Sequence, residues 1–295
     1  KHLQFLTICY IILSEGKETQ NYKNYEEDKQ MTKFNENRTF GVEIEFQGSR
    51  EEVARLMNLK GVATEVEEYN HTTKGYWKLV TDASCGYELV SPILKGREGL
   101  RQLKIACEAL KEAGVTVDRR CGLHVHHDVN DYSVKQITNI FALYVKLEET
   151  IDTLMPQSRR RNNNTYCQSL FGYRSQQDIL NSLKEVKVVE DIGNIWSSRY
   201  VKVNFQSYIK YGTVEFRQHS GTIEFEKMYN WILLTQQIVE RAQRTVKYSY
   251  EEAPSNTPLL TLQRMLKIIA SQGADEEIAN MANWFRGRAK QLAAA

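Results

Sequence analysis

Hydrophobic and polar residues alternate strictly over residues 39–47. Phenylalanine, valine and isoleucine side chains fall on one side of this segment, and the other side carries Gly41, Glu43, Glu45 and Gln47. A period of two is that of a β-strand with one face in the core. Further strand-like segments follow at residues 62–66, 76–81, 86–91, 121–129, 199–208 and 212–219, the last two joined by a predicted turn at 210–212. These segments predict a sheet built from short strands.

Helical spacing of apolar residues interrupts this strand pattern. It occurs at residues 53–57, 100–113, 137–154, 225–246 and 262–269, and residues 275–290 begin acidic and end basic, which suits a helix dipole. Helix starts are marked by capping signals: Ser49 with Glu52, Ser133 with Gln136, and Thr257 before Pro258. Strands of hairpin-like spacing, with helices inserted and appended, predict an α+β domain with an antiparallel sheet.

The length of 295 residues suits one large domain or two small ones. Residues 1–37 are predicted to form an N-terminal arm or linker, and their apolar run at 3–13 is shorter than the roughly 20 residues that span a bilayer. Residues 38–248 are predicted to form the main domain, with 249–295 as a C-terminal helical extension packed on it. The formal charge of +2 gives no reason to expect a nucleic acid or membrane partner.

The five cysteines are an odd number and include no C-x-x-C pair. A disulfide framework or a zinc knuckle is therefore not expected. We expect instead a reducing, cytoplasmic location. Cys107 lies on the apolar stripe of a predicted helix, where a buried packing role is expected.

Four of the predicted strands carry an unusual polar face. The period of two places acids, imidazoles and one guanidinium opposite the apolar side chains: Glu43 and Glu45; Glu88; His124, His126 and Asp128; Thr213, Glu215, Arg217 and His219. A solvated outer face is the ordinary interpretation of such alternation. Carboxylates gathered on neighbouring strands repel one another unless a cation lies between them, so we favour a metal site. His127 has the opposite parity and is expected to be structural.

Carboxylate oxygens as the main ligands favour Mg²⁺, or Mn²⁺ where one imidazole joins them. A zinc site that uses the His124-x-His126 pair stays open as an alternative. The sequence contains neither a P-loop nor a Rossmann glycine motif. Any bound phosphate would therefore be held by metals and arginines, and Arg217 is one candidate.

Five segments, in this order along the chain, resemble the amidoligase family. They are Phe40-Gly-Val-Glu-Ile-Glu45, Gly86-Tyr-Glu-Leu-Val-Ser-Pro92, Cys121-Gly-Leu-His-Val-His126, residues 159–167, and the segment from Gly212 to Thr222. That family is related to the carboxylate–amine ligases typified by glutamine synthetase and glutamate–cysteine ligase. The resemblance implies a glutamine-synthetase-like catalytic domain, in which a curved antiparallel sheet holds metal ions and ATP on its concave face and packs helices on the other.

The resemblance also implies roles for individual residues. Glu43, His124 and Glu215 are similar to ligands of a metal that bridges the ATP phosphates, and Glu45 and Glu88 to ligands of a metal nearer the accepting carboxylate. Arg217 is similar to an arginine that contacts substrate or the transferred phosphate. Cofactor-binding positions are expected at Arg160, Tyr166 and Arg199.

The function implied is that of an ATP-dependent ligase, which forms an amide through an acyl phosphate. Its substrates would be a carboxylate and an amine of an amino acid, a peptide or a protein side chain, and a homo-oligomer is compatible with the sequence. His126 or His219 would accept the proton of the ammonium group, and the loop at residues 159–165 would act as a lid. A guanidino-kinase-like phosphotransferase and a zinc-dependent hydrolase remain as alternatives.

Overall fold

The computed structural model describes residues 33–245, 258–269 and 274–294. Most of the predicted N-terminal arm, with its apolar run, lies outside these residues, as does the capping residue Thr257. Within the described part of the chain, no helix combines the length and the apolar character needed to cross a bilayer.

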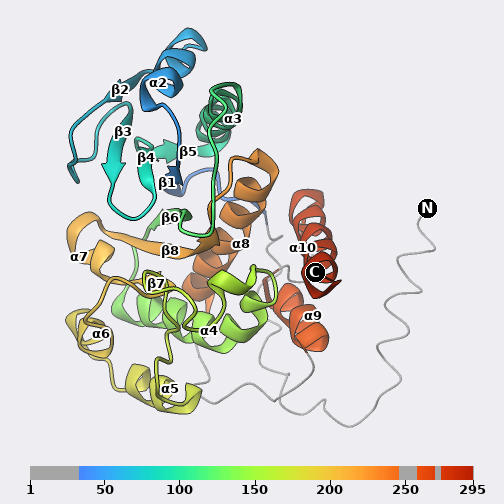
Figure 1. Cartoon of the computed structure of the whole chain (residues 1–295). Coiled ribbons are helices and arrows are strands. Elements are labelled where there is room, and N and C mark those ends of the chain that lie inside the picture. Colours follow the sequence, from blue (N-terminus) through green and yellow to red (C-terminus); the bar gives the residue numbers. More distant parts are fainter. Residues whose placement is uncertain (1–32, 246–257, 270–273, 295) are drawn as a thin grey trace. The chain divides into compact units, whose positions relative to one another are not determined.

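Strands and helices are interleaved along the chain, as Figure 1 shows. The first half contains β1 (Thr39–Phe46), α2 (Arg50–Leu59), β2 (Thr64–Val66), β3 (Trp77–Asp82), β4 (Gly86–Val90), β5 (Leu94–Lys95), α3 (Gly96–Glu112), β6 (Gly122–Asp128) and α4 (Val134–Asp152). The second half contains the 3-10 helix η1 (Gln157–Arg159), α5 (Gln176–Lys184), α6 (Glu190–Ile195), β7 (Val203–Asn204), α7 (Gln206–Tyr211), β8 (Thr213–Ser220), α8 (Phe225–Arg244), α9 (Pro258–Ile269) and α10 (Glu276–Ala294).

The strands form one open, curved sheet in the order β2-β3-β4-β1-β6-β8-β7, and β5 pairs with β1. All pairs are antiparallel except β2 with β3, which is parallel. The α+β class is therefore confirmed. β1 lies between β4 and β6, so the strands predicted to carry Glu43, Glu88 and His124 are direct neighbours.

One face of the sheet is covered by α3, α4 and α8 (Figure 1). The rings of Tyr144 on α4 and Phe216 on β8 lie 5.8 Å apart. His127 of β6 is completely buried on the same side, and one of its ring nitrogens lies 2.8 Å from the hydroxyl of Thr235 on α8. Burial lowers the pKa of His127 to about 3, so the ring is neutral at physiological pH. The structural role expected for His127 is thus confirmed.

The strand expected at residues 199–208 is wrong for most of its length. Only Val203 and Asn204 pair with β8, and α7 follows at once. The side chain of Asn204 accepts a hydrogen bond from the amide of Gln206, and the hydroxyl of Ser207 donates to the Asn204 carbonyl oxygen. Such local side-chain bonds compete with strand pairing and start a helix instead. Gly212 ends α7 with a φ of 69°, which favours glycine.

Both ends of the described chain pack against α8 or its neighbours. Phe34 is buried, and the amide of Asn35 donates to the side chain of Gln236 on α8 at 2.8 Å. On the C-terminal side, Glu277 of α10 pairs with Arg97 of α3 at 2.6 Å. Residues 34–35, which were assigned to the arm, therefore contact the main domain, while the predicted domain boundaries themselves stay a prediction.

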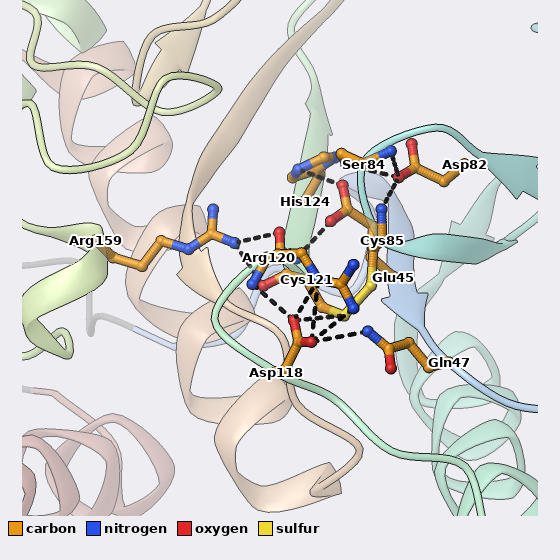
Figure 2. Close-up of a disulfide and its surroundings, with 11 residues drawn as sticks. Glu45, Gln47, Asp82, Ser84, Cys85, Asp118, Arg120, Cys121, His124 and Arg159 are labelled. Carbon is orange, nitrogen blue, oxygen red and sulfur yellow. Dashed lines mark hydrogen bonds and ion pairs between the residues drawn. A yellow bond between two sulfur atoms is a disulfide. The ribbon is translucent and has the colours of Figure 1, made fainter.

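The structure contradicts the expectation drawn from the cysteine count. Cys85 and Cys121 form a disulfide (Figure 2), and Cys107 and Cys167 are free and buried. The two cysteines immediately precede the pairing segments of β4 and β6, which flank β1, and their Cα atoms lie 5.2 Å apart. A pairing of this kind depends on strand order, which cysteine spacing along the chain does not reveal.

Candidate active site

A cavity of about 880 Å³ lies against the polar side of the sheet. Its floor is formed by the polar residues of β1, β3, β4, β6 and β8, and its walls by the loops at residues 69–73, 83–84 and 199–200 and by α7. The predicted residues that line it are Glu43, Glu45, Glu88, His124, His126, Tyr166, Arg199, Glu215 and Arg217.

Strand register brings the predicted acids and imidazoles together. Glu43 pairs with His124 across β1 and β6, and His126 pairs with Glu215 across β6 and β8. Glu45 and Glu88 pair across β1 and β4. Paired residues of antiparallel strands project from the same side of the sheet, and this places all six side chains on the cavity floor.

Glu43 is the centre of this group. Its carboxylate oxygens lie 3.0 Å from Nδ1 of His124 and 3.4 Å from Nε2 of His126. The other nitrogen of His124 lies 3.4 Å from Glu45, and Nδ1 also lies 3.6 Å from Glu215. The two imidazoles are therefore surrounded by carboxylates.

Two overlapping sets of side chains could each hold a cation. Glu43, Glu88 and His124 form one set, and Glu43, His126 and Glu215 form the other, with the ligand atoms of each set within 4.8 Å of one another. This grouping differs from the one implied by the resemblance, because Glu88 joins Glu43 rather than Glu45. The carboxylate of Glu45 instead accepts a hydrogen bond from the amide of Gly122 at 2.6 Å.

The electrostatics of these side chains fit a bound divalent cation. Burial and the neighbouring charges of Glu43, Glu45 and Asp82 raise the pKa of Glu88 well above its usual value. Nε2 of His126 is buried without a hydrogen-bond partner. An excess of buried negative charge beside an unsatisfied imidazole nitrogen is the environment in which a cation is stabilised.

The remaining pKa shifts follow from the contacts between acids and imidazoles. Burial alone would raise the pKa of Glu43, but the adjacent imidazoles of His124 and His126 hold it well below its usual value. Burial likewise opposes ionisation of Glu215, yet the charge of Arg217 lowers its pKa. His126 shows the opposite balance, since Glu215 and Glu43 overcome the effect of burial and raise its pKa.

Arg217 is held at the edge of the acidic group. Its Nη1 lies 2.5 Å from Glu215, and its Nε donates to the carbonyl oxygen of Tyr166 at 3.5 Å. Its backbone amide donates to the carbonyl oxygen of Lys202. The side chain is thus fixed between strand β8 and the loop that carries Tyr166.

The structure does not place His219 in the cavity. A register shift in the β6–β8 pair makes Leu123, a core residue, face His219 directly. One extra residue on β8 inverts its side-chain alternation, so the ring of His219 packs on Trp231 of α8 and its Nδ1 donates to the carbonyl oxygen of Ser220. The expectation that His219 shares a face with Glu215 is wrong for this reason.

The arginine-rich loop presents a different arginine from the one expected. Arg160 turns away from the cavity, and its Nε donates to the carbonyl oxygen of Met155 at 2.8 Å. Arg159, by contrast, is buried and lines the cavity. Tyr166 lies at the cavity wall, where its ring contacts Tyr200 edge-to-face at 5.3 Å, and Arg199 lies over that same tyrosine.

A buried ionic cluster supports this loop from below. Nζ of Lys202, which has no solvent exposure, lies 2.8 Å from Glu148 and 2.6 Å from Asp152 of α4. The second oxygen of Asp152 accepts the amide of Arg161, whose φ of 48° is unusual for a residue other than glycine. Gln218, next to Arg217, also donates to Asp152. The cluster therefore fixes both the loop and the irregular part of β8.

Lys78 is a cavity residue that the sequence analysis missed. It lies on β3, is buried, and its Nζ donates to the backbone oxygens of Asn70 and Thr72, each at 2.9 Å. These contacts hold the loop 69–73 over the cavity, and Tyr211 of α7 donates to the carbonyl oxygen of His71 from the other side. In the predicted strand at residues 76–81, Lys78 points to the side opposite Trp77 and Leu79. This alternation would have identified Lys78 as a residue of the polar face.

Solved structures with a similar arrangement are distant in sequence. They include the complex between the prokaryotic ubiquitin-like protein Pup and its ligase PafA (12% identity, TM-score 0.42) and a bifunctional glutathione synthetase from Pasteurella multocida (11%, 0.47). The alignments cover 87% of this chain in both cases, but 63% and 49% of those chains. A glutamine synthase homolog aligns at 12% identity and a TM-score of 0.38, over 88% of this chain and 67% of its own.

No curated protein shows significant sequence similarity to this chain. Residues 36–239 match the family described as "Putative amidoligase enzyme". The match spans most of the chain and includes every strand of the sheet and all six acids and imidazoles of the cavity floor. The chain therefore belongs to the amidoligase family of carbon–nitrogen ligases.

Proposed function

We propose that this protein is an ATP-dependent carboxylate–amine ligase that uses a divalent cation. The observation that carries the proposal is the pair of overlapping ligand sets that share Glu43 on the floor of one cavity. The family match supports carbon–nitrogen ligation as the reaction class. Ligand sets composed mainly of carboxylates, with one imidazole each, support Mg²⁺ or Mn²⁺ rather than zinc.

The proposed reaction has two steps. The carboxylate of the first substrate takes the γ-phosphoryl group of ATP, which gives an acyl phosphate and ADP. The amine of the second substrate then attacks the acyl carbon, and phosphate leaves as the amide forms. A bound divalent cation would offset the negative charge of the phosphates during transfer.

Several polar side chains of the cavity have a proposed role. Glu43, Glu88 and His124 would hold one cation, and Glu215 supports the same region through Arg217, which would contact the transferred phosphoryl group. His126 would accept the ammonium proton, because its unpartnered Nε2 lines the cavity and His219 does not. Tyr166 and Arg199 would contact ATP at the cavity wall.

The substrates are proposed by class only. A carboxylate and an amine of an amino acid, a peptide or a protein side chain would suit the reaction, without a nucleic acid or membrane partner. We also propose that the protein is cytoplasmic. A homo-oligomer is compatible with this proposal, as is a monomer. The odd number of cysteines does not support a cytoplasmic location, because Cys85 and Cys121 form a disulfide.

The test is release of phosphate from ATP in the presence of Mg²⁺ and pooled amino acids, amines and peptides, followed by product analysis. An amide together with free phosphate supports the ligase. A phosphorylated guanidine would establish the phosphotransferase instead, and zinc-dependent hydrolysis without ATP would establish the hydrolase. Glu215→Gln is the negative control, since the change removes the charge that pairs with Arg217.

A further inference from the structure

Arg159 is a buried cavity residue with no part in the reaction proposed for the other side chains. Its side chain is only 2% exposed, and it lines the cavity. Among residues 33–245, 258–269 and 274–294 it forms no ion pair with a carboxylate, although four glutamates line the same cavity. A buried guanidinium without a counter-charge is costly, and such groups are ordinarily paired or bind a ligand.

One edge of the guanidinium is fixed by backbone groups. Nη2 donates to the carbonyl oxygens of Cys121 at 2.5 Å and Arg120 at 3.2 Å, as Figure 2 shows. The Cys121 carbonyl also accepts the amide of Gly221, and Cys121 is joined to Cys85. Nε of the same guanidinium is buried without a hydrogen-bond partner.

Gly122 lies beside the guanidinium. A methyl group at this position would come within 3.0 Å of Nε2 of His124 and within 3.4 and 3.5 Å of the two terminal nitrogens of Arg159. The absence of a side chain therefore leaves room beside Gly122 for both the Arg159 guanidinium and the His124 ring. The amide of Gly122 is bonded to Glu45, so the guanidinium stands at the end of the cavity where Glu45 and His124 meet.

Arg217 provides the contrast. Its charge is already balanced by Glu215 at 2.5 Å, whereas the charge of Arg159 is balanced by no carboxylate in the described part of the chain. A rigid guanidinium with one edge anchored and its charge uncompensated is arranged to bind a planar or tetrahedral oxyanion.

We propose that Arg159 binds an oxyanion of a substrate, either a carboxylate or a phosphoryl group, at the Glu45–His124 end of the cavity. The identity of that substrate rests on the proposed function, whereas the binding of an oxyanion by Arg159 does not. It makes Arg159, rather than the neighbouring Arg160, the anion-binding residue of the arginine-rich loop.

The experiment compares wild type with Arg159→Gln and Arg159→Lys. Each protein is titrated with inorganic phosphate, with acetate and with Mg-ATP, and binding is followed by calorimetry and by the shift in thermal midpoint. Arg174→Gln is the matched control, since Arg174 is exposed, donates to the carbonyl oxygen of Ile195 at 3.1 Å and does not line the cavity. Lysine at position 159 keeps the charge but loses the planar fork.

We expect Arg159→Gln to weaken binding of phosphate or acetate roughly 10- to 100-fold, with a smaller loss for the lysine variant and none for Arg174→Gln. A selective loss of phosphate and Mg-ATP binding identifies the phosphoryl group, and a selective loss of acetate binding identifies the carboxylate. A merely structural role would lower the thermal midpoint without changing the ligand-induced shift.

Two results would overturn the inference. One is equal oxyanion affinity in wild type and Arg159→Gln, and the other is a wild-type protein that binds neither phosphate nor acetate. Failure of the proposed function is a separate result, namely no Mg²⁺-dependent turnover of ATP by a wild-type protein whose phosphate or acetate binding still depends on Arg159.

Discussion

Glu43 and His124 stand directly opposite each other on β1 and β6, and Oε2 of Glu43 lies 3.0 Å from Nδ1 of His124. Glu43 also reaches His126 and belongs to both candidate ligand sets. A single carboxylate therefore connects the two halves of the cavity floor, and its removal should affect both.

We predict that Glu43→Gln abolishes Mg²⁺-dependent consumption of ATP while the fold remains intact. Glutamine has nearly the same shape but no charge, so it is a poor ligand for a hard cation. Phosphate release and circular dichroism are the measurements, and Glu108→Gln on the exposed side of α3 is the control. Unchanged ATP turnover in Glu43→Gln would remove the basis of the metal site.

Arg217→Lys should also lose ATP turnover, by about 100-fold or more. Its guanidinium contacts Glu215 through Nη1 and the Tyr166 carbonyl oxygen through Nε, and an ammonium group cannot make both contacts in one plane. The rate constant of single-turnover phosphate transfer is the measurement. If lysine supports the wild-type rate, Arg217 acts only as a positive charge.

His219 should make stability, but not catalysis, depend on pH. Burial against Trp231 lowers its pKa from the usual 6.5 to about 4. Between these values the unfolded chain binds a proton that the folded protein does not, so stability falls as the pH drops from 6.5 towards 4, by at most about 1.4 kcal/mol per pH unit.

Urea unfolding of wild type and His219→Gln over that pH range tests this expectation. The glutamine variant should show a shallower loss of stability on acidification and an unchanged pH profile of ATP turnover. If the pH profile of ATP turnover shifts in His219→Gln, His219 takes part in the reaction and this prediction is wrong.

The disulfide should stabilise the fold around the cavity. Cys85 and Cys121 are 36 residues apart, and a cross-link that closes a loop of this size contributes about 2–4 kcal/mol. Replacement of both by serine, or treatment of wild type with dithiothreitol, should lower the free energy of unfolding by that amount. Dithiothreitol should leave the double serine variant unaffected, and an equal effect on both proteins would show that the disulfide is not the cause.

The polar face of the sheet could be predicted because its origin is local. Alternation over residues 39–47 and 121–129 fixes which side of each strand carries Glu43, Glu45, His124 and His126, and no distant contact alters that parity. The same reasoning failed at His219, because a bulge adds one residue to β8 and inverts every later position. Nothing in the local sequence marks that bulge.

The arginine-rich loop shows the same limit in another form. The sequence identified the segment at residues 159–165, but the choice between Arg159 and Arg160 depends on Cys121 and Gly122, which are distant along the chain. The Cys85–Cys121 disulfide was likewise hidden, since β1 must come between β4 and β6 before the two cysteines can meet.

The sequence by itself thus determined the fold class and, wherever a strand is regular, which side chains share a face, because both follow from the short-range periodicity of the backbone. Only the tertiary structure decided which strands are neighbours, where the register shifts and which arginine enters the cavity. These features arise from long-range pairing and packing, and the free energies that select them are shared among residues far apart in the chain.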